Sequence, residues 1–131
     1  MKSSFLFPLI ILVNITSAVS ADGDFPLVEA ARNQQVDMVK QLLKKRVDVN
    51  HTYNDGTSAL HWAAHRDNLE IAGLLIRAKA DPDQANAYGV TPLYLACTNK
   101  NVELVKSLLE AGANANAALW SGETVLMNCA R

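Results

Sequence analysis

The apolar residues of this chain recur with the spacing of helices that are buried along one face. The clearest stripe begins near residue 102 and consists of Val102, Leu104, Val105, Leu108 and Leu109. Positions three, four and seven residues apart lie on the same side of a helix, so the stripe predicts an amphipathic helix there. A polar break, "TNKN" at residues 98–101, separates it from a shorter apolar segment upstream.

The upstream segment carries the signals of a helix start. Thr91 offers a hydroxyl that can cap a helix, and Pro92 stands at the first helical position, where its missing N–H costs nothing. We expect this helix to run from Pro92 to about Thr98. Gly112 is expected to end the second helix in the left-handed conformation. Two short antiparallel helices and a turned loop therefore form one unit.

The same unit recurs every 33 residues. Glycines keep this step at Gly23, Gly56, Gly89 and Gly122, leucines at Leu27, Leu60, Leu93 and Leu126, and small residues at Ala30, Ala63, Ala96 and Cys129 and at Ala31, Ala64, Cys97 and Ala130. A fixed period of this size indicates stacked supersecondary units. Isolated helices of this length are marginal in water. Stacking supplies the stability, at about 1.5–3 kcal/mol for each buried leucine.

Two positions and the last copy depart from the repeated pattern. Arg46 and Lys79 stand where Gly112 ends its helix, so each is expected to carry about 1 kcal/mol of strain if the left-handed geometry is kept. The fourth copy, "SGETVLMNCAR", stops inside its first helix at Arg131. Because a stack needs a covered end, we expect the chain to be a fragment or its reading frame to continue.

Charge excludes some classes of partner. The 12 Lys and Arg residues nearly balance the 13 Asp and Glu residues, for a net charge of −1. No basic surface argues for binding to nucleic acid or to an anionic membrane. Recognition must therefore depend on particular side chains.

Residues 1–21 have the pattern of a signal peptide. Lys2 precedes nine apolar residues, "FLFPLIILV", and small residues follow up to Ala21. We expect export, cleavage after Ala21 and a periplasmic or secreted mature protein that has no contact with the membrane. The alternative is an uncleaved anchor, although nine apolar residues fall well short of the roughly 20 that a spanning helix needs.

The motifs "SALHWAA" at 58–64, "TPLYLAC" at 91–97 and "LLEAGANANA" at 108–117 resemble ankyrin repeats, whose 33-residue unit has a Thr-Pro-Leu-His-x-Ala-Ala signature. The resemblance covers residues 23–131. It implies an all-α solenoid of helix-turn-helix units with β-hairpin loops over residues 22–131, in a bacterial exported protein. The repeats would span about 23–52, 53–85, 86–118 and, incompletely, 119–131. The residues that match the motif are Gly56, Leu60, His61, Gly89, Thr91, Pro92, Leu93, Gly112, Gly122 and Leu126.

The segment "HWAAH" raises the question of a metal site. His61 and His65 are four residues apart, a spacing that puts both imidazoles on one helix face. The metalloprotease motif also requires a glutamate after the first histidine, where this chain has Trp62, and no third ligand is evident. By resemblance, His61 forms a hydrogen bond within the stack. We expect no metal and no cofactor.

The two cysteines occupy small-residue columns of neighbouring first helices. The axes of neighbouring helices are expected to lie about 8–10 Å apart. The Cα atoms of a disulfide must lie within roughly 7 Å of each other. The comparison of these two distances favours two buried thiols at Cys97 and Cys129. A disulfide between them would require distortion of the helices.

The resemblance implies that partners bind to the loop tips and to the exposed side of the first helices. The candidate residues there are Arg32, Asn54, Asp55, Trp62, His65, Arg66, Tyr88, Val90, Asn99, Trp120 and Glu123. Trp62, Arg66, Tyr88 and Trp120 stand out, because binding energy concentrates in aromatic and arginine side chains. The alternative is that the two tryptophans pack between repeats and that the arginines only solvate a face.

No phosphate loop, carboxylate pair or Ser-His-Asp order indicates catalysis. We therefore expect a monomeric, non-enzymatic, exported module that binds a protein partner. An alternative is the targeting segment of a larger exported enzyme whose catalytic domain lies beyond residue 131. A structural spacer is the third reading.

Overall fold

The computed structural model describes residues 25–131, so the predicted signal peptide at residues 1–21 lies outside the described part of the chain. Within the described residues there are seven helices and no strand. The helices are α2 (Pro26–Arg32), α3 (Val36–Lys44), α4 (Ala59–His65), α5 (Leu69–Arg77), α6 (Pro92–Thr98), α7 (Val102–Glu110) and α8 (Val125–Ala130).

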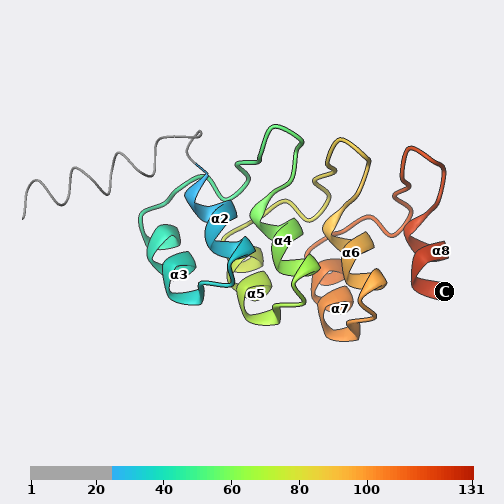
Figure 1. Cartoon of the computed structure of the whole chain (residues 1–131). Coiled ribbons are helices and arrows are strands. Elements are labelled where there is room, and N and C mark those ends of the chain that lie inside the picture. Colours follow the sequence, from blue (N-terminus) through green and yellow to red (C-terminus); the bar gives the residue numbers. More distant parts are fainter. Residues whose placement is uncertain (1–24) are drawn as a thin grey trace, which may run out of the picture.

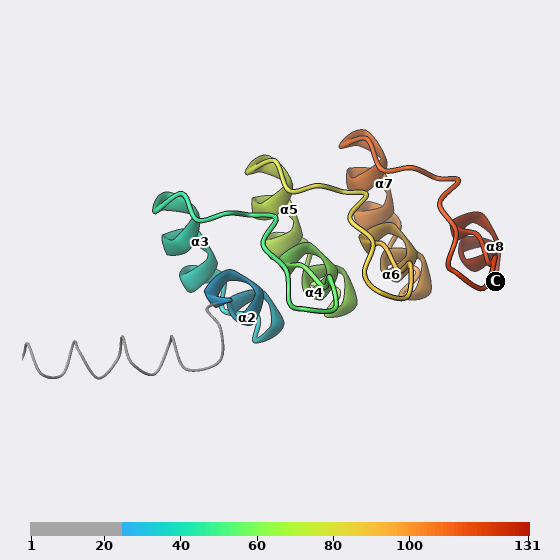
Figure 2. The same ribbon diagram turned by 90° about the horizontal axis from the view of Figure 1, so that it is seen from above.

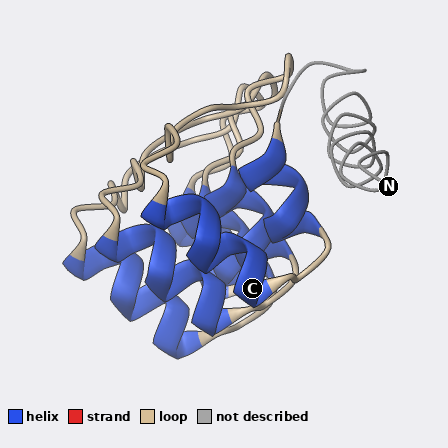
Figure 3. Ribbon diagram, turned by 90° about the vertical axis from the view of Figure 1, so that its left-hand side faces the viewer, coloured by secondary structure: helices blue, strands red, loops and turns tan. Residues whose placement is uncertain are grey.

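The helices stack in two layers (Figures 1 and 2). The first helices of the units, α2, α4, α6 and α8, form one row, and α3, α5 and α7 form the other. In each of the first three units the first helix packs on the second, and equivalent helices of neighbouring units pack on each other, so that α8 packs on α6. The long loops that connect the units gather along one edge (Figure 3). This arrangement confirms the predicted all-α solenoid.

Short polar side chains start most of the helices. In each case a side-chain oxygen accepts a hydrogen bond from the backbone N–H three residues further on, which is standard N-capping. The capping residues are Ser58, Asn68, Thr91, Asn101 and Thr124. The first unit differs, since Phe25 and Gln35 precede its helices without a side-chain cap.

The second helices end in the left-handed conformation, as the sequence predicts. Gly112 has φ +102°, and Arg46 and Lys79 keep the same region at +58° and +72°. A second set of left-handed residues, which the sequence analysis did not predict, lies at the turn between the two helices of each unit: Gln34, Asp67 and Lys100. A left-handed side chain costs about 1 kcal/mol or more, so five non-glycine positions carry this strain.

The core consists of the small-residue columns and the leucines that they surround. Ala31, Ala63 and Ala64 are fully buried between neighbouring first helices, and Leu60 and Leu93 are buried between the two layers. Leu126 was expected to share this environment, but it is 57% exposed. The cause is that no described second helix lies beneath α8 to cover it.

The prediction of two free thiols is wrong. Cys97 and Cys129 form a disulfide that joins α6 to α8, with their Cα atoms 4.7 Å apart. The prediction failed because it compared helix axes instead of facing residues. A Cα atom lies about 2.3 Å from its helix axis, so facing Cα atoms on axes 8–10 Å apart approach to about 3.4–5.4 Å. The alanine columns face each other across this contact, and the cysteines occupy them.

Polar contacts also hold α8 on α6. The side-chain amide of Asn128 donates to the carbonyl oxygen of Tyr94 at 2.9 Å and to the hydroxyl of Thr98 at 2.8 Å. Val125 is buried in the same contact. The last helix is therefore attached to the stack by one apolar residue, these hydrogen bonds and the disulfide.

Candidate partner-binding face

Three tight turns form the tips of the loops between units, and we call residues 53–57, 86–90 and 119–123 the finger loops. In the first, the N–H of Tyr53 donates to the carbonyl of Thr57, and the N–H of Gly56 donates back to the carbonyl of Tyr53, both at 2.9 Å. The other two repeat this pattern. It is the three-residue hairpin turn that requires a left-handed residue at its end, here a glycine. The expected hairpins are thus present as turns, and isolated bridges flank the first and third of them in place of strands.

Neighbouring finger loops are bonded to each other. The N–H of Ala87 donates to the carbonyl of Asp55 at 2.7 Å, and the N–H of Trp120 donates to that of Tyr88 at 3.5 Å. A Cβ added at Gly89 would lie 3.1 Å from the backbone nitrogen of Trp120. Glycine is therefore needed here for close approach as well as for φ. The finger loops form one continuous edge.

Tyr88 and Trp120 project from this edge. Their side chains are 70% and 77% exposed, although both are large and apolar. The indole N–H of Trp120 donates to the carbonyl of Ala87 at 2.6 Å. This hydrogen bond holds the ring in place while leaving its faces accessible to a partner.

Trp62 lies between two arginines on the row of first helices. The guanidinium carbon of Arg32 is 5.4 Å from the centre of the indole ring, and that of Arg66 is 5.8 Å from it. Both distances are within the range of cation–π attraction. The imidazole of His65 meets the same ring edge-on at 5.5 Å. Four of the predicted residues therefore form one cluster, which we call the Trp62 cluster.

Two predicted partner residues have structural hydrogen bonds. The Nε of Arg66 donates to the carbonyl of Arg32 at 3.1 Å, and the side-chain amide of Asn99 donates to the carbonyl of Ala64 at 2.8 Å. Both carbonyls lie at the end of the preceding first helix, where intrahelical donors are lacking. The amide of Asn99 is thus engaged in stacking, whereas the terminal nitrogens of Arg66 remain exposed.

The remaining candidates lie on the finger loops. Asn54 and Asp55 are exposed at the first tip, where the carboxylate of Asp55 accepts from the N–H of Thr57. Glu123 is partly buried and is engaged on both sides: it accepts from the hydroxyl of Tyr94 at 3.0 Å and pairs with Arg131 at 2.8 Å. Burial, followed by the bond to Glu123, raises the pKa of Tyr94.

His61 holds the base of the second finger loop. It is buried, and its Nδ1 accepts from the N–H of Ser58 at 3.0 Å, so the proton lies on Nε2 and is donated to the carbonyl of Val90 at 2.8 Å. Burial lowers the pKa of His61 and keeps the ring neutral. Both nitrogens are therefore engaged: Nδ1 bonds within its own unit, and Nε2 joins this unit to the next.

A shallow groove of about 230 Å³ lies beside Trp62, and we call it the Trp62 groove. Its lining residues are Thr57, His61, Trp62, His65, Asn86, Val90 and Leu95. Val90 is among the partner residues predicted from the sequence, whereas Leu95 is not. The 33-residue step could have identified it, because Leu95 follows Trp62 by 33 residues and therefore shares its exposed column.

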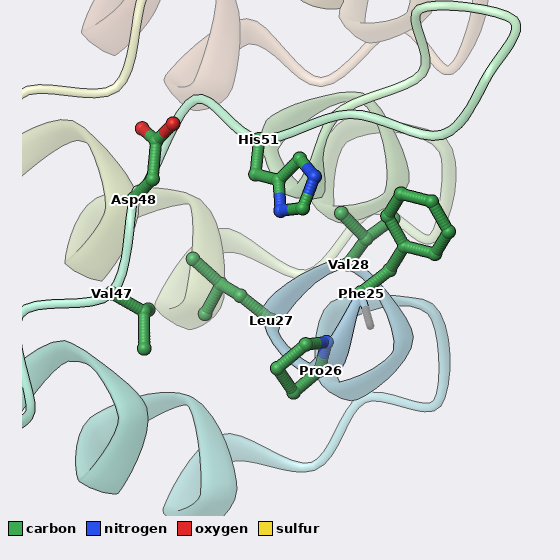
Figure 4. A pocket seen from close by; sticks show the side chains of 7 residues that line it. All are labelled: Phe25, Pro26, Leu27, Val28, Val47, Asp48 and His51. Carbon is green, nitrogen blue, oxygen red and sulfur yellow. The ribbon is translucent and has the colours of Figure 1, made fainter. Parts of the chain in front are cut away.

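A second pocket, of about 280 Å³, lies at the N-terminal end of the described stack (Figure 4). The apolar side chains of Pro26, Leu27 and Val47 line it, and the ring of Phe25 packs at a tilt of 47° against His51, with ring centres 5.1 Å apart. None of the predicted partner residues lines it. It is the open side of the first unit, where no described repeat precedes α2.

The part of the chain that the structure describes contains no group of three His, Cys, Asp or Glu side chains arranged to hold a metal ion. Among the same residues, no helix is long and apolar enough to cross a membrane.

The family model of ankyrin repeats, in three copies, matches residues 4–86 and 74–131. The chain therefore belongs to the ankyrin repeat family, whose members generally serve as protein–protein interaction modules and are typically non-catalytic. The first matched range includes most of the segment predicted to be a signal peptide. No curated protein matches the chain.

Proposed function

We propose that this chain is an exported, non-enzymatic module that binds a protein partner through its finger loops and the adjoining row of first helices. The observation that carries the proposal is the exposure of two aromatic side chains on the finger loops. Tyr88 and Trp120 are more than two-thirds exposed, and Trp120 is held by its indole hydrogen bond. A rigid, exposed aromatic ring loses little entropy on binding, which favours it as an interface anchor.

The backbone of the finger loops supports the same proposal. Hydrogen bonds join each loop to the next, so the three tips keep fixed positions relative to one another. The row of first helices beside them presents the Trp62 cluster, whose rings and guanidinium groups are partly exposed. A partner that contacts two or three repeats would therefore meet a surface that is already ordered.

The disulfide supports the export part of the proposal. Bonds of this kind persist in oxidising compartments and are rare where thiols are kept reduced. The Cys97–Cys129 bond is therefore in accord with the signal-peptide pattern of residues 1–21. Mass spectrometry of the protein purified from its own cells would test this part. A mature N-terminus at Asp22 in an extracytoplasmic fraction is expected, and an intact Met1 in the cytoplasm would contradict it.

Site-specific photocrosslinking tests the binding face. Benzoylphenylalanine is placed at position 88 or 120 of the full chain, and at position 106 as a control. Lys106 is also exposed but lies on α7, in the other layer. After illumination of the cells that express the chain, we expect the same covalent protein adduct from positions 88 and 120 and none from position 106. Adducts from position 106 alone, or none at any position, would overturn the proposed face.

A further inference from the structure

We propose that the Trp62 groove, together with Arg66 and Arg32, binds an extended acidic peptide segment in which an apolar residue and a carboxylate lie two positions apart. This inference rests on the proposed function, and it names the chemistry of the partner at one part of that face.

The groove favours an apolar side chain because most of its free surface is apolar and two of its polar lining residues, His61 and Asn86, are engaged; the indole N–H of Trp62 is buried without a hydrogen-bond partner among the described residues. Both nitrogens of His61 are hydrogen-bonded, and the side-chain oxygen of Asn86 already accepts from two backbone N–H groups. What remains for a ligand is the indole of Trp62 with the side chains of Val90 and Leu95. A shallow apolar site of about 230 Å³ accommodates one side chain of the size of leucine or phenylalanine and buries it against these three residues.

The guanidinium groups select the carboxylate. Arg66 donates its Nε to a backbone carbonyl, and its terminal nitrogens face no carboxylate within 4 Å in the described residues. Arg32 has a long pair with Glu29, at 3.7 Å between half-exposed groups. An arginine stacked on an aromatic ring keeps its N–H fork free at the edge, and that fork matches a carboxylate.

The other charges on this face direct the acid to Arg66. Glu29 lies beside Arg32, and Asp55 is close enough to His61 to affect its pKa. Both carboxylates repel an acid placed near the finger loops or at the start of the row of helices. The unmatched positive charge is therefore concentrated at Arg66, beside the indole that also lines the groove.

The spacing follows from the shared indole. The centre of the Trp62 ring lies 5.8 Å from the guanidinium carbon of Arg66, and the same ring forms one wall of the groove. In an extended peptide, residues two positions apart project to the same side and are about 7 Å apart. A peptide that places an apolar side chain in the groove thus brings the residue two positions away to Arg66.

A phage-displayed library of random 12-residue peptides, selected against the full chain, tests this proposal. The peptides are fused to the coat protein through their C-termini, so only side-chain carboxylates are presented. We expect enrichment of peptides with Asp or Glu two positions from Leu, Ile or Phe. Enrichment of basic or purely apolar peptides, or no enrichment at all, would overturn the proposal.

A double-mutant cycle then assigns the contact. Fluorescence anisotropy is measured with a labelled synthetic copy of an enriched peptide and with its Asp→Asn or Glu→Gln counterpart. We expect Arg66→Gln and the change in the peptide each to weaken binding at least tenfold, and the two together to weaken it little further, because they remove the same contact. Arg77→Gln, at an exposed arginine of α5 outside the groove, serves as the matched control and should leave binding unchanged.

Arg32→Gln serves as a second variant. Arg66→Gln also removes the hydrogen bond from the Arg66 side chain to the carbonyl of Arg32, whereas the side chain of Arg32 makes no bond to a backbone carbonyl in the described part of the chain. We expect it to weaken the acidic peptide as well, with an unchanged circular dichroism spectrum. If an enriched peptide is unaffected by both variants but is lost with Trp120→Ala, the acidic assignment is overturned and the finger loops remain the binding face. The photocrosslinking experiment tests the proposed function independently of the acidic assignment.

Discussion

Reduction of the Cys97–Cys129 disulfide is expected to loosen the last helix of the stack and to leave the others in place. The bond joins α6 to α8, and no described second helix packs beneath α8. In a repeat protein each unit interacts mainly with its neighbours, so a weakened end opens without unfolding the whole.

The magnitude follows from the length of chain that the bond closes. For a separation of 32 residues, the loop-entropy relation gives about 3.7 kcal/mol for complete unfolding. When only the end of the chain opens, from Ala113 to Cys129, the loop has about 16 residues and the relation gives about 3.1 kcal/mol. Loss of the bond should therefore raise the open population of α8 by roughly 100- to 200-fold.

Hydrogen–deuterium exchange of the Cys97→Ala, Cys129→Ala variant measures this population. Alanine is the residue that other units have in both columns, so the substitution changes packing little. We expect the amide hydrogens of α8 to exchange roughly 100-fold faster, and those of α4 to be unchanged. Wild-type protein in dithiothreitol should behave like the variant. Unchanged exchange in α8, or equal acceleration in every helix, would refute the reasoning.

Three further predictions concern stability. Because burial lowers the pKa of His61 below its ordinary value of 6.5, the unfolded chain binds a proton that the folded chain does not, so the urea midpoint should fall as pH decreases from 6.5 to the folded pKa; a flat profile would contradict this. Lys79→Gly should raise stability by about 0.5–1 kcal/mol in urea titration by relieving the positive φ, whereas Lys79→Ala, which keeps the strain, should give no gain. Gly89→Ala should lower the free energy of unfolding by about 1–3 kcal/mol and shift the fluorescence of Trp120, because the new Cβ would lie 3.1 Å from the backbone nitrogen of Trp120. Gly122→Ala should lower it less, because Gly122 has φ +89° but no atom of the described residues within 4 Å of an added Cβ. Equal losses of stability would argue against the steric part of this reasoning.

Much of the fold could be predicted from the sequence because its signals are local. Thr91 and Pro92 start a helix by chemistry within one turn, and the helix does run from Pro92 to Thr98. Gly112 ends its partner with the expected positive φ. The 33-residue step then implies stacking, since each unit has an apolar face that only a neighbour can bury. These inferences required no knowledge of distances between units.

The candidate binding face could be predicted only as a set of columns. Exposure at a loop tip or on a first helix follows from register, and the structure does place Tyr88 and Trp120 in the open. Register does not show which exposed side chains already form hydrogen bonds within the stack. Asn99 and Glu123 were counted among the candidates, yet both have hydrogen-bond partners from neighbouring units.

The sequence by itself thus determined the repeat, the ends of its helices and the family, because caps, breaks and a fixed period act within one unit or one step. Only the tertiary structure decided what meets across units. The Trp62 cluster depends on the rotation between two first helices, and the disulfide depends on Cα atoms 4.7 Å apart across a contact whose axes are farther apart. Such distances are set by how alanine columns allow helices to pack, and no spacing along one chain specifies them.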